Sequence, residues 1–273
     1  MKTVSNSGIM DRSELYRQIT QKKSMLCVGL DTDPEKMPAG ISMYDFNRLI
    51  IDATAQYAVA YKPNLAFYEA QGIDGWKTLE ETVGYIRANY PGMFIIADAK
   101  RGDIGNTAKM YAKALLGNLD FDAVTLAPYM GSDSIRPFLE YKGKWAIVLA
   151  VTSNASAAEF QYRDCGGEPL FMKVVKEMAG ISSPDNMMFV TGATHVSELA
   201  EVRKAVPDNF LLVPGVGAQG GSVADVIKYG SNSMGGLLIN ASRSILYAGS
   251  KINDFEYAAS EAAKSLVRQM GIA

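Results

Sequence analysis

The chain has 273 residues, of which 48% are hydrophobic and 21% charged, a mix typical of one or two globular domains. Its formal net charge of −2 gives no electrostatic case for nucleic acid or an anionic membrane as a partner, so any attraction for an anion must be local. The longest apolar runs, such as "WAIVLAV" at 145–151, are far shorter than the ~20 residues that span a bilayer. With no apolar core of signal-peptide type at the N-terminus, we expect a cytoplasmic protein.

Cysteine and histidine are too scarce for several kinds of catalytic centre. Cys27 and Cys165 match no metal-ligand spacing and form no disulfide framework, so we expect two free thiols. His195 is the only histidine, which excludes a metal site with several histidine ligands and argues against a His-based catalytic triad.

Short apolar runs recur along the chain and predict eight strands. They lie at 25–31, 57–63, 93–99, 122–127, 145–151, 187–192, 210–216 and 235–240. Continuous rather than alternating apolar runs suit parallel strands that are covered on both faces.

Helical spacing, with apolar residues three or four apart, is clearest in the intervening segments 44–57, 75–90 and 106–118 and in the final segment 253–270. Asn106 is a candidate N-cap for the third of these helices. Asn253 and Glu256 resemble a capping box at the start of the last one.

Eight strands that alternate with helices predict a protein of the α/β class, a (β/α)8 TIM barrel. No Pro/Gly/Ser linker divides the chain, so we expect a single domain over 1–273 with a short N-terminal helical extension at about 1–23. A doubly wound sheet is the alternative. It would place a glycine-rich phosphate loop after the first strand, where this chain has "GLDTDPEKMP".

Polar residues stand where the predicted strands end, and in such barrels the chemistry gathers at these C-terminal ends. They are Asp31, Lys62, Asp98, Lys100, Thr125, Ser153, Gln219 and Arg243. Asp98 and Lys100 are two residues apart, so strand alternation puts them on one face, and Asp103 follows in the next loop. Each of these residues alone is compatible with a turn, a cap or a structural ion pair.

The last two strand ends look like a phosphate site. "VPGVGAQGG" at 213–221 is rich in glycine, which lets backbone N–H groups approach an anion closely. "NASRS" at 240–244 offers Arg243 for bidentate contact with a phosphate. Loops after strands seven and eight are the usual phosphate site of these barrels, and this combination favours an active site over a structural cluster.

These segments together resemble orotidine 5′-phosphate decarboxylases. The resemblance rests on "GLDTDP", "YKPNLAFYEAQG", "DAKRGDIGNTA", "VTSNAS…EFQ", "PGVGAQGG" and "NASRSI", in order from about residue 24 to 247. Lys-Arg-Gly-Asp inside the third motif resembles the second sequence subgroup of that family. The Asp-x-Lys-x-x-Asp core is shared with sister sugar-phosphate enzymes.

The resemblance implies a homodimeric barrel that converts orotidine 5′-monophosphate to UMP and CO2 in pyrimidine biosynthesis, with no metal or cofactor. It implies a charged catalytic network of Lys62, Asp98, Lys100 and Asp103. It also implies ribose contacts for Asp31 and Lys62, a pyrimidine contact for Ser153, and phosphate contacts for Gln219 and Arg243. Asp103, Ile104 and Thr107 match residues that reach into the neighbouring subunit's site.

Two details complete these expectations. Thr125, at the end of the fourth strand, is expected among the substrate-binding residues. "SNAS" at 153–156 departs from the proline and glycine that many relatives have after Ser-Asn, which affects the expected shape of the loop over the pyrimidine.

The charged cluster suits cofactor-free decarboxylation, because a carbanion in the ring plane must be stabilised electrostatically and then protonated. Lys100 is the expected agent, kept charged by Asp98 and Asp103. A second role for Asp98, repulsion of the substrate carboxylate, stays open. Three alternatives remain: a metal-dependent sugar-phosphate decarboxylase or aldolase-like enzyme, a Schiff-base lysine enzyme, and a non-catalytic nucleotide-binding barrel.

Overall fold

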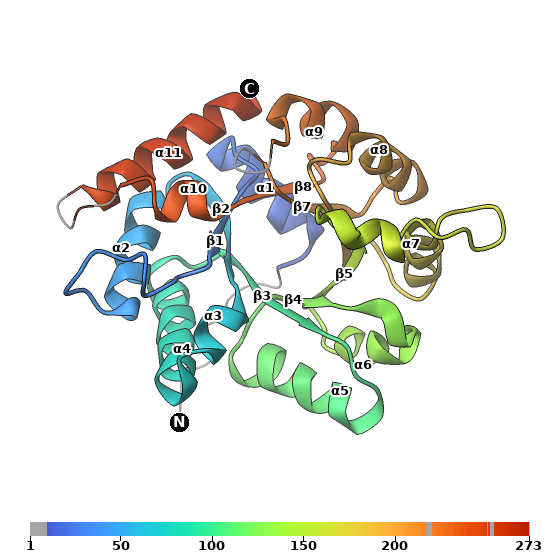
Figure 1. Ribbon diagram of the computed structural model, residues 1–273, viewed down its shortest axis with the longest axis horizontal. Helices are drawn as coiled ribbons and strands as arrows, with labels where there is room; N and C mark the ends of the chain where they lie inside the picture. Colours follow the sequence, from blue (N-terminus) through green and yellow to red (C-terminus); the bar gives the residue numbers. More distant parts are fainter. Residues whose placement is uncertain (1–9, 217–219, 250, 252–253, 273) are drawn as a thin grey trace.

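Eight parallel strands pair in chain order and close into a barrel, and the helices surround it (Figure 1). This computed structural model describes residues 10–216, 220–249, 251 and 254–272. Closure confirms the predicted (β/α)8 barrel. The alternative of a doubly wound sheet is wrong, because such a sheet is open whereas here β1 (Leu26–Leu30) pairs with β8 (Leu237–Ala241).

The strand positions follow the apolar runs, and no strand end differs from its predicted position by more than two residues. The remaining strands are β2 (Ala58–Pro63), β3 (Phe94–Arg101), β4 (Ala123–Leu126), β5 (Trp145–Val151), β6 (Met187–Thr191) and β7 (Phe210–Pro214). Every residue of β1, β2, β4, β6 and β8 is buried, as expected for strands that are covered on both faces.

The helices largely match the predicted segments. They are α1 (Arg12–Lys22), α2 (Met43–Thr54), α3 (Leu65–Glu69), α4 (Gly72–Asn89), α5 (Gly105–Ala112), α6 (Arg136–Leu139), α7 (Leu170–Gly180), α8 (Val196–Ala205), α9 (Val223–Gly230), α10 (Arg243–Leu246) and α11 (Phe255–Met270). Shorter turns are the π-helical η1 (Lys113–Asn118) and the 3-10 turns η2 (Pro128–Met130), η3 (Ser132–Ser134) and η4 (Ala155–Glu159). Asn253 of the expected capping box lies outside the described residues.

The start of α5 corrects one prediction. Asn106 is not the N-cap, because the extended residue before the helix is Ile104 and no side chain caps it. The chain turns at Gly105, with φ at 57°, one residue before Asn106. Asn106 therefore lies in the first turn of the helix.

Aromatic side chains fill the N-terminal end of the barrel. Phe94, Trp145 and Phe210 begin the alternate strands β3, β5 and β7, and both phenyl rings meet the indole edge-on, with centroids 6.1 and 6.4 Å away. The indole Nε1–H donates to the carbonyl of Met10 at 2.7 Å. Side chains from alternate strands thus form a packed layer at this end, which leaves the opposite end for a site.

Two further expectations concern thiols and membrane spans. Cys27 is buried and Cys165 is half-buried, and both are free thiols as predicted. Among the described residues, no helix has the length and apolar character needed to cross a bilayer.

Candidate active site

A cavity of about 170 Å³ opens at the C-terminal end of the barrel. It is lined by Asp31, Lys62, Asp98, Pro214, Gly215, Val216, Asn240, Ala241, Ser242, Arg243 and Ser244. Four predicted site residues from β1, β2, β3 and the loop after β8 thus share one cavity, although as many as 212 positions separate them in the sequence (243 − 31).

Asp98 lies between two ammonium groups. Its Oδ2 is 2.6 Å from Nζ of Lys62, and its Oδ1 is 2.6 Å from Nζ of Lys100. The side chains of Lys62 and Asp98 are only 5% and 10% exposed, whereas that of Lys100 is 51% exposed. The lysine nearer to solvent is therefore the one that is free to meet a ligand.

Mutual compensation keeps these buried groups charged. Burial alone would lower the pKa of Lys62, but the carboxylates of Asp98 and Asp31 raise that pKa above its usual range. Burial alone would raise the pKa of Asp98, but the two ammonium groups hold that pKa well below its usual range. The array is a preassembled set of fixed charges.

Lys100 occupies a strained backbone position. Its φ is 46°, in the left-handed region that a residue with a side chain rarely adopts. The pairing of β3 with β4 shifts here, because Ala97 is opposite Val124 and Arg101 is opposite Leu126. Residues 98–100 therefore form a bulge, and bulges next to active sites commonly re-aim a side chain.

Thr125 binds this bulge from within the barrel. Its hydroxyl donates to Oδ1 of Asp98 and accepts from the backbone N–H groups of Ala99 and Lys100, each at 3.0 Å. The residue is 1% exposed. The sequence predicted a substrate contact for Thr125, and the structure gives its hydroxyl three partners inside the protein.

Asp103 does not complete the array within one chain. Its Oδ1 accepts the backbone N–H of Ile104 at 2.8 Å. Across the residues that the structure describes, no ion pair joins Asp103 to Lys62 or Lys100. Ile104 and Thr107 are exposed beside it. The network of a single chain therefore has three members rather than the expected four.

The opposite side of the cavity holds an unpaired cation. Arg243 is exposed, and no carboxylate of the described residues pairs with it. Gly215 lines the cavity with φ at 95°, a conformation that favours glycine. Gln219, the second expected phosphate contact, lies outside the described residues.

Ser153 lies apart from this cavity. It lines a neighbouring cavity of about 330 Å³ together with Tyr162 and His195. The "SNAS" loop is anchored by Gln161, whose amide accepts from the backbone N–H of Thr152 and donates to its hydroxyl, both at 2.8 Å. The pyrimidine contact expected of Ser153 stays a prediction.

Sequence reasoning missed Asn240, which is 7% exposed and lines the cavity at the end of β8. Its Oδ1 is buried without a hydrogen-bond donor, and its Nδ2 reaches only Ser242 Oγ at 3.5 Å. A buried amide without partners in a ligand cavity indicates a contact that the substrate completes. The signal was available, since Asn240 ends an apolar strand in the same way as Asp31 follows one.

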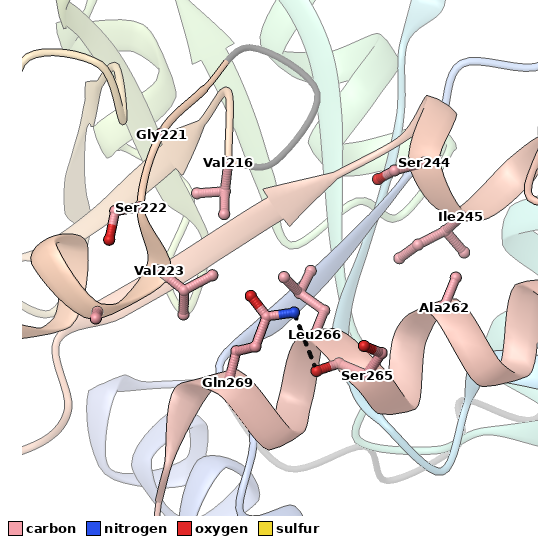
Figure 2. Close-up of a pocket in the computed structure, with 11 residues that line it drawn as sticks. Val216, Gly221, Ser222, Val223, Ser244, Ile245, Ala262, Ser265, Leu266 and Gln269 are labelled. Carbon is pink, nitrogen blue, oxygen red and sulfur yellow. Dashed lines mark hydrogen bonds between the residues drawn. The ribbon is translucent and has the colours of Figure 1, made fainter.

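A larger groove of about 560 Å³ adjoins the cavity, and Val216 and Ser244 line both. Figure 2 shows its apolar lining, with Val223 from α9, Ile245 from α10 and Leu266 from α11. The groove extends the cavity along the outside of the barrel.

Comparisons with known proteins agree with this geometry. A sequence model of the family described as "Orotidine 5′-phosphate decarboxylase / HUMPS family" matches residues 24–256. The chain is 52% identical over 267 residues to orotidine 5′-phosphate decarboxylase of Phocaeicola vulgatus, covering 96% of this chain and 98% of the relative. It is 54% identical over 258 residues to that of Christiangramia forsetii, covering 93% and 95%. The solved structure of Leishmania donovani OMP decarboxylase has a TM-score of 0.82 at 35% identity and covers 96% of this chain and 99% of its own.

Proposed function

The chain belongs to the orotidine 5′-phosphate decarboxylase / HUMPS family, and we propose that it converts orotidine 5′-monophosphate to UMP and CO2. The observation that carries the proposal is the contact of one buried carboxylate, Asp98, with two ammonium groups at 2.6 Å each. Lys62 and Asp98 of this array line a cavity that Arg243 also lines, and no carboxylate of the described residues pairs with that arginine.

Loss of CO2 from C6 of the orotate ring leaves an electron pair in the ring plane, which the π system cannot accept. An ammonium that is already in position stabilises this charge as it develops, without reorganisation during the reaction. Lys100 suits this role because its side chain is half exposed while Asp98 holds its end. The C–C bond to the carboxylate breaks, CO2 leaves, and the ammonium of Lys100 donates its proton to C6.

Arg243 and the glycine-rich loop bind the phosphate in this proposal. The phosphate does not react, but its binding energy holds the ring against the charged array. Asp31 supports ribose binding, since its buried Oδ1 has no hydrogen-bond donor among the described residues and a ribose hydroxyl supplies one.

The alternatives fit the same residues less well. A metal-dependent sugar-phosphate enzyme needs free carboxylate oxygens, and both oxygens of Asp98 already accept from ammonium groups. A Schiff-base enzyme needs a neutral amine, but the pKa of Lys62 is raised rather than lowered by its carboxylate neighbours. A binding protein without chemistry has no need for a lysine held in a strained backbone conformation against the buried carboxylate of Asp98.

The test is to mix the purified protein with orotidine 5′-monophosphate in EDTA and to follow the ultraviolet band of orotate. We expect loss of the band with stoichiometric CO2 and UMP. A folded protein that binds UMP but releases no CO2 would favour the binding-protein alternative. No turnover of orotidine 5′-monophosphate, together with turnover of a 3-keto-sugar phosphate that requires an added divalent metal, would favour the sugar-phosphate class.

We also propose that the enzyme is a cytoplasmic homodimer whose subunits share active sites. Exposed apolar side chains follow β3 and β4, with Ile104, Met110 and Tyr129 being 47%, 59% and 88% exposed. The loop of Ile104 and the turn η2 are neighbours, because the N–H of Ala127 donates to the carbonyl of Arg101 at 2.8 Å. Asp103 lies in this loop, and within the described part of its own chain it has no lysine partner. A second copy accounts for both the apolar surface and the unpaired carboxylate.

Hybrid dimers test this arrangement. A Lys100→Ala chain and an Asp103→Ala chain are each expected to be inactive alone, whereas a mixture should recover activity at the sites that combine two intact residues. Isolated heterodimers without any recovery would show that Asp103 serves its own chain.

A further inference from the structure

The bulge in β3 raises a question of stability. A residue with a side chain is strained in the left-handed region, so the surroundings must hold Lys100 there. The bulge also takes the N–H groups of Ala99 and Lys100 out of the ladder with β4. These two partly buried donors need a partner, because an N–H group that is shielded from water and unpaired is costly.

The hydroxyl of Thr125 supplies that partner and also fixes the carboxylate. As an acceptor it receives both N–H groups, and as a donor it reaches Oδ1 of Asp98, the oxygen that also binds Nζ of Lys100. Two acceptor lone pairs and one O–H donor are the full capacity of a hydroxyl, and all three are used. Among the hydrogen bonds of the described residues, no other side chain joins the backbone of Lys100 to Asp98.

A second contact holds the outer end of the bulge without reaching the reacting groups. Arg101 donates to the carbonyl of Ala99 at 3.2 Å, pairs with Glu69, and lies 5.2 Å from the ring centroid of Tyr111. It fixes where β3 leaves the barrel. The orientation of the Lys100 and Asp98 side chains toward each other depends on Thr125.

We propose that Thr125 is a positioning residue of the decarboxylation, whose single hydroxyl holds Lys100 in its strained conformation and aligns Asp98 with it. All three hydrogen bonds of its hydroxyl are made inside the protein, so it acts through these two residues. This inference rests on the proposed function for its kinetic part, but its structural part is independent of any substrate.

The kinetic test uses variants of nearly equal shape. Thr125→Val removes the hydroxyl and should lower kcat by about 100-fold, the cost of a small misplacement, while KM for orotidine 5′-monophosphate stays near that of the wild type. Thr125→Ser keeps the hydroxyl and should restore most of the lost kcat. If the valine variant does not fold, Thr125→Cys replaces it, with kcat expected below that of the serine variant because a thiol is a weak hydrogen-bonding group.

Thr191 provides the matched control. It is fully buried at the end of β6, and its hydroxyl has no hydrogen-bond partner in the described part of the chain. Thr191→Val should therefore leave kcat unchanged. Wild-type kcat in Thr125→Val, or an equal loss in Thr191→Val, would overturn the proposal.

Amide hydrogen exchange gives a readout without substrate. In Thr125→Val the N–H groups of Ala99 and Lys100 should exchange about tenfold faster than in the wild type, since each loses one hydrogen bond. Unchanged exchange at both positions would refute the positioning role even if the wild type is active. An inactive wild type with faster exchange in the variant would instead reject the proposed function and keep the structural assignment.

Discussion

The two sides of the cavity differ in how far the chain satisfies its own polar groups. On the side of β2 and β3, Asp98 is bonded to both lysines and to Thr125. On the side of β8, Arg243 has no carboxylate partner among the described residues and Asn240 has an amide oxygen without a donor. On the first side the carboxylate of Asp98 has its partners before a ligand arrives, whereas on the other side Arg243 and Asn240 find theirs in the ligand.

Burial explains this division. An ion that is taken out of water needs an opposite charge within the protein, and the side chains of Lys62 and Asp98 on the first side are almost fully buried. Arg243 is exposed, so water can solvate it until an anion replaces the water. The buried side, at β2 and β3, therefore supplies the fixed charges that the chemistry needs. The open side, at β8, supplies binding energy through its contacts with the ligand.

Asp98→Asn should have the largest effect on the buried side after loss of Lys100 itself. The change leaves Lys62 buried without its nearest counter-charge, which costs about 3–5 kcal/mol. We expect a clearly lower midpoint of unfolding in urea and severe loss of kcat. The control is Asp74→Asn, since that carboxylate is 91% exposed and pairs only with Lys77 on the surface. Equal stability of the two variants would show that Asp98 does not offset the cost of burying Lys62.

The same pair predicts a dependence of stability on pH. The pKa of Asp98 is lower in the folded chain than in the unfolded chain, so its contribution is present above about pH 4 and is lost as the pH falls through the folded value. The pKa of Lys62 is raised, so its contribution is present below its unfolded value and is lost at strongly alkaline pH. The free energy of unfolding in urea, measured between pH 2 and 7, should fall less steeply toward acid pH in Asp98→Asn than in the wild type. A difference of one pKa unit corresponds to about 1.4 kcal/mol of this free energy. Parallel curves would contradict the assignment.

Arg243→Ala should affect the open side alone. A charge-assisted bond to phosphate contributes about 1.5–3 kcal/mol, so kcat/KM for orotidine 5′-monophosphate should fall roughly 10- to 100-fold. The melting temperature should not change, because the side chain is exposed and unpaired. Orotidine, which lacks the phosphate, is the matched control substrate. If the variant also loses activity toward orotidine, Arg243 has a role beyond phosphate binding.

Asn240→Ala should have the smallest effect. We expect KM to rise about fivefold through loss of one neutral hydrogen bond, with little loss of stability because, among the described residues, the amide oxygen has no donor and the amide nitrogen reaches only Ser242 Oγ at 3.5 Å. Asn89→Ala, at an exposed helix end, serves as the control. An unchanged KM together with a lower melting temperature would make Asn240 a structural residue.

The fold was predictable because parallel strands that are covered on both faces have continuous apolar sequences, which are easy to recognise. "FLLVP" and "WAIVLAV" are each read directly as β7 and β5. Strand order then follows from alternation with helices, and the C-terminal ends locate Asp31, Lys62 and Asp98 at one cavity.

Other features depend on pairing that a sequence does not display. Simple alternation predicted that Asp98 and Lys100 share a face, and they do meet, but through a bulge whose register is set against β4. The role of Thr125 follows from that bulge and not from its own neighbours in sequence. The N-cap of α5 was wrong because the turn at Gly105 comes one residue before Asn106.

The role of the Lys62–Asp98–Lys100 array is tested most sharply by the Lys100→Ala variant. Its turnover is measured at saturating orotidine 5′-monophosphate, together with its affinity for UMP. We expect the rate of decarboxylation to fall by at least about 10⁴-fold, because the ammonium of Lys100 both stabilises the carbanion and protonates it. The fold and the affinity for UMP should persist. Turnover near that of the wild type in a folded variant would contradict the claim that the Lys62–Asp98–Lys100 array performs the reaction.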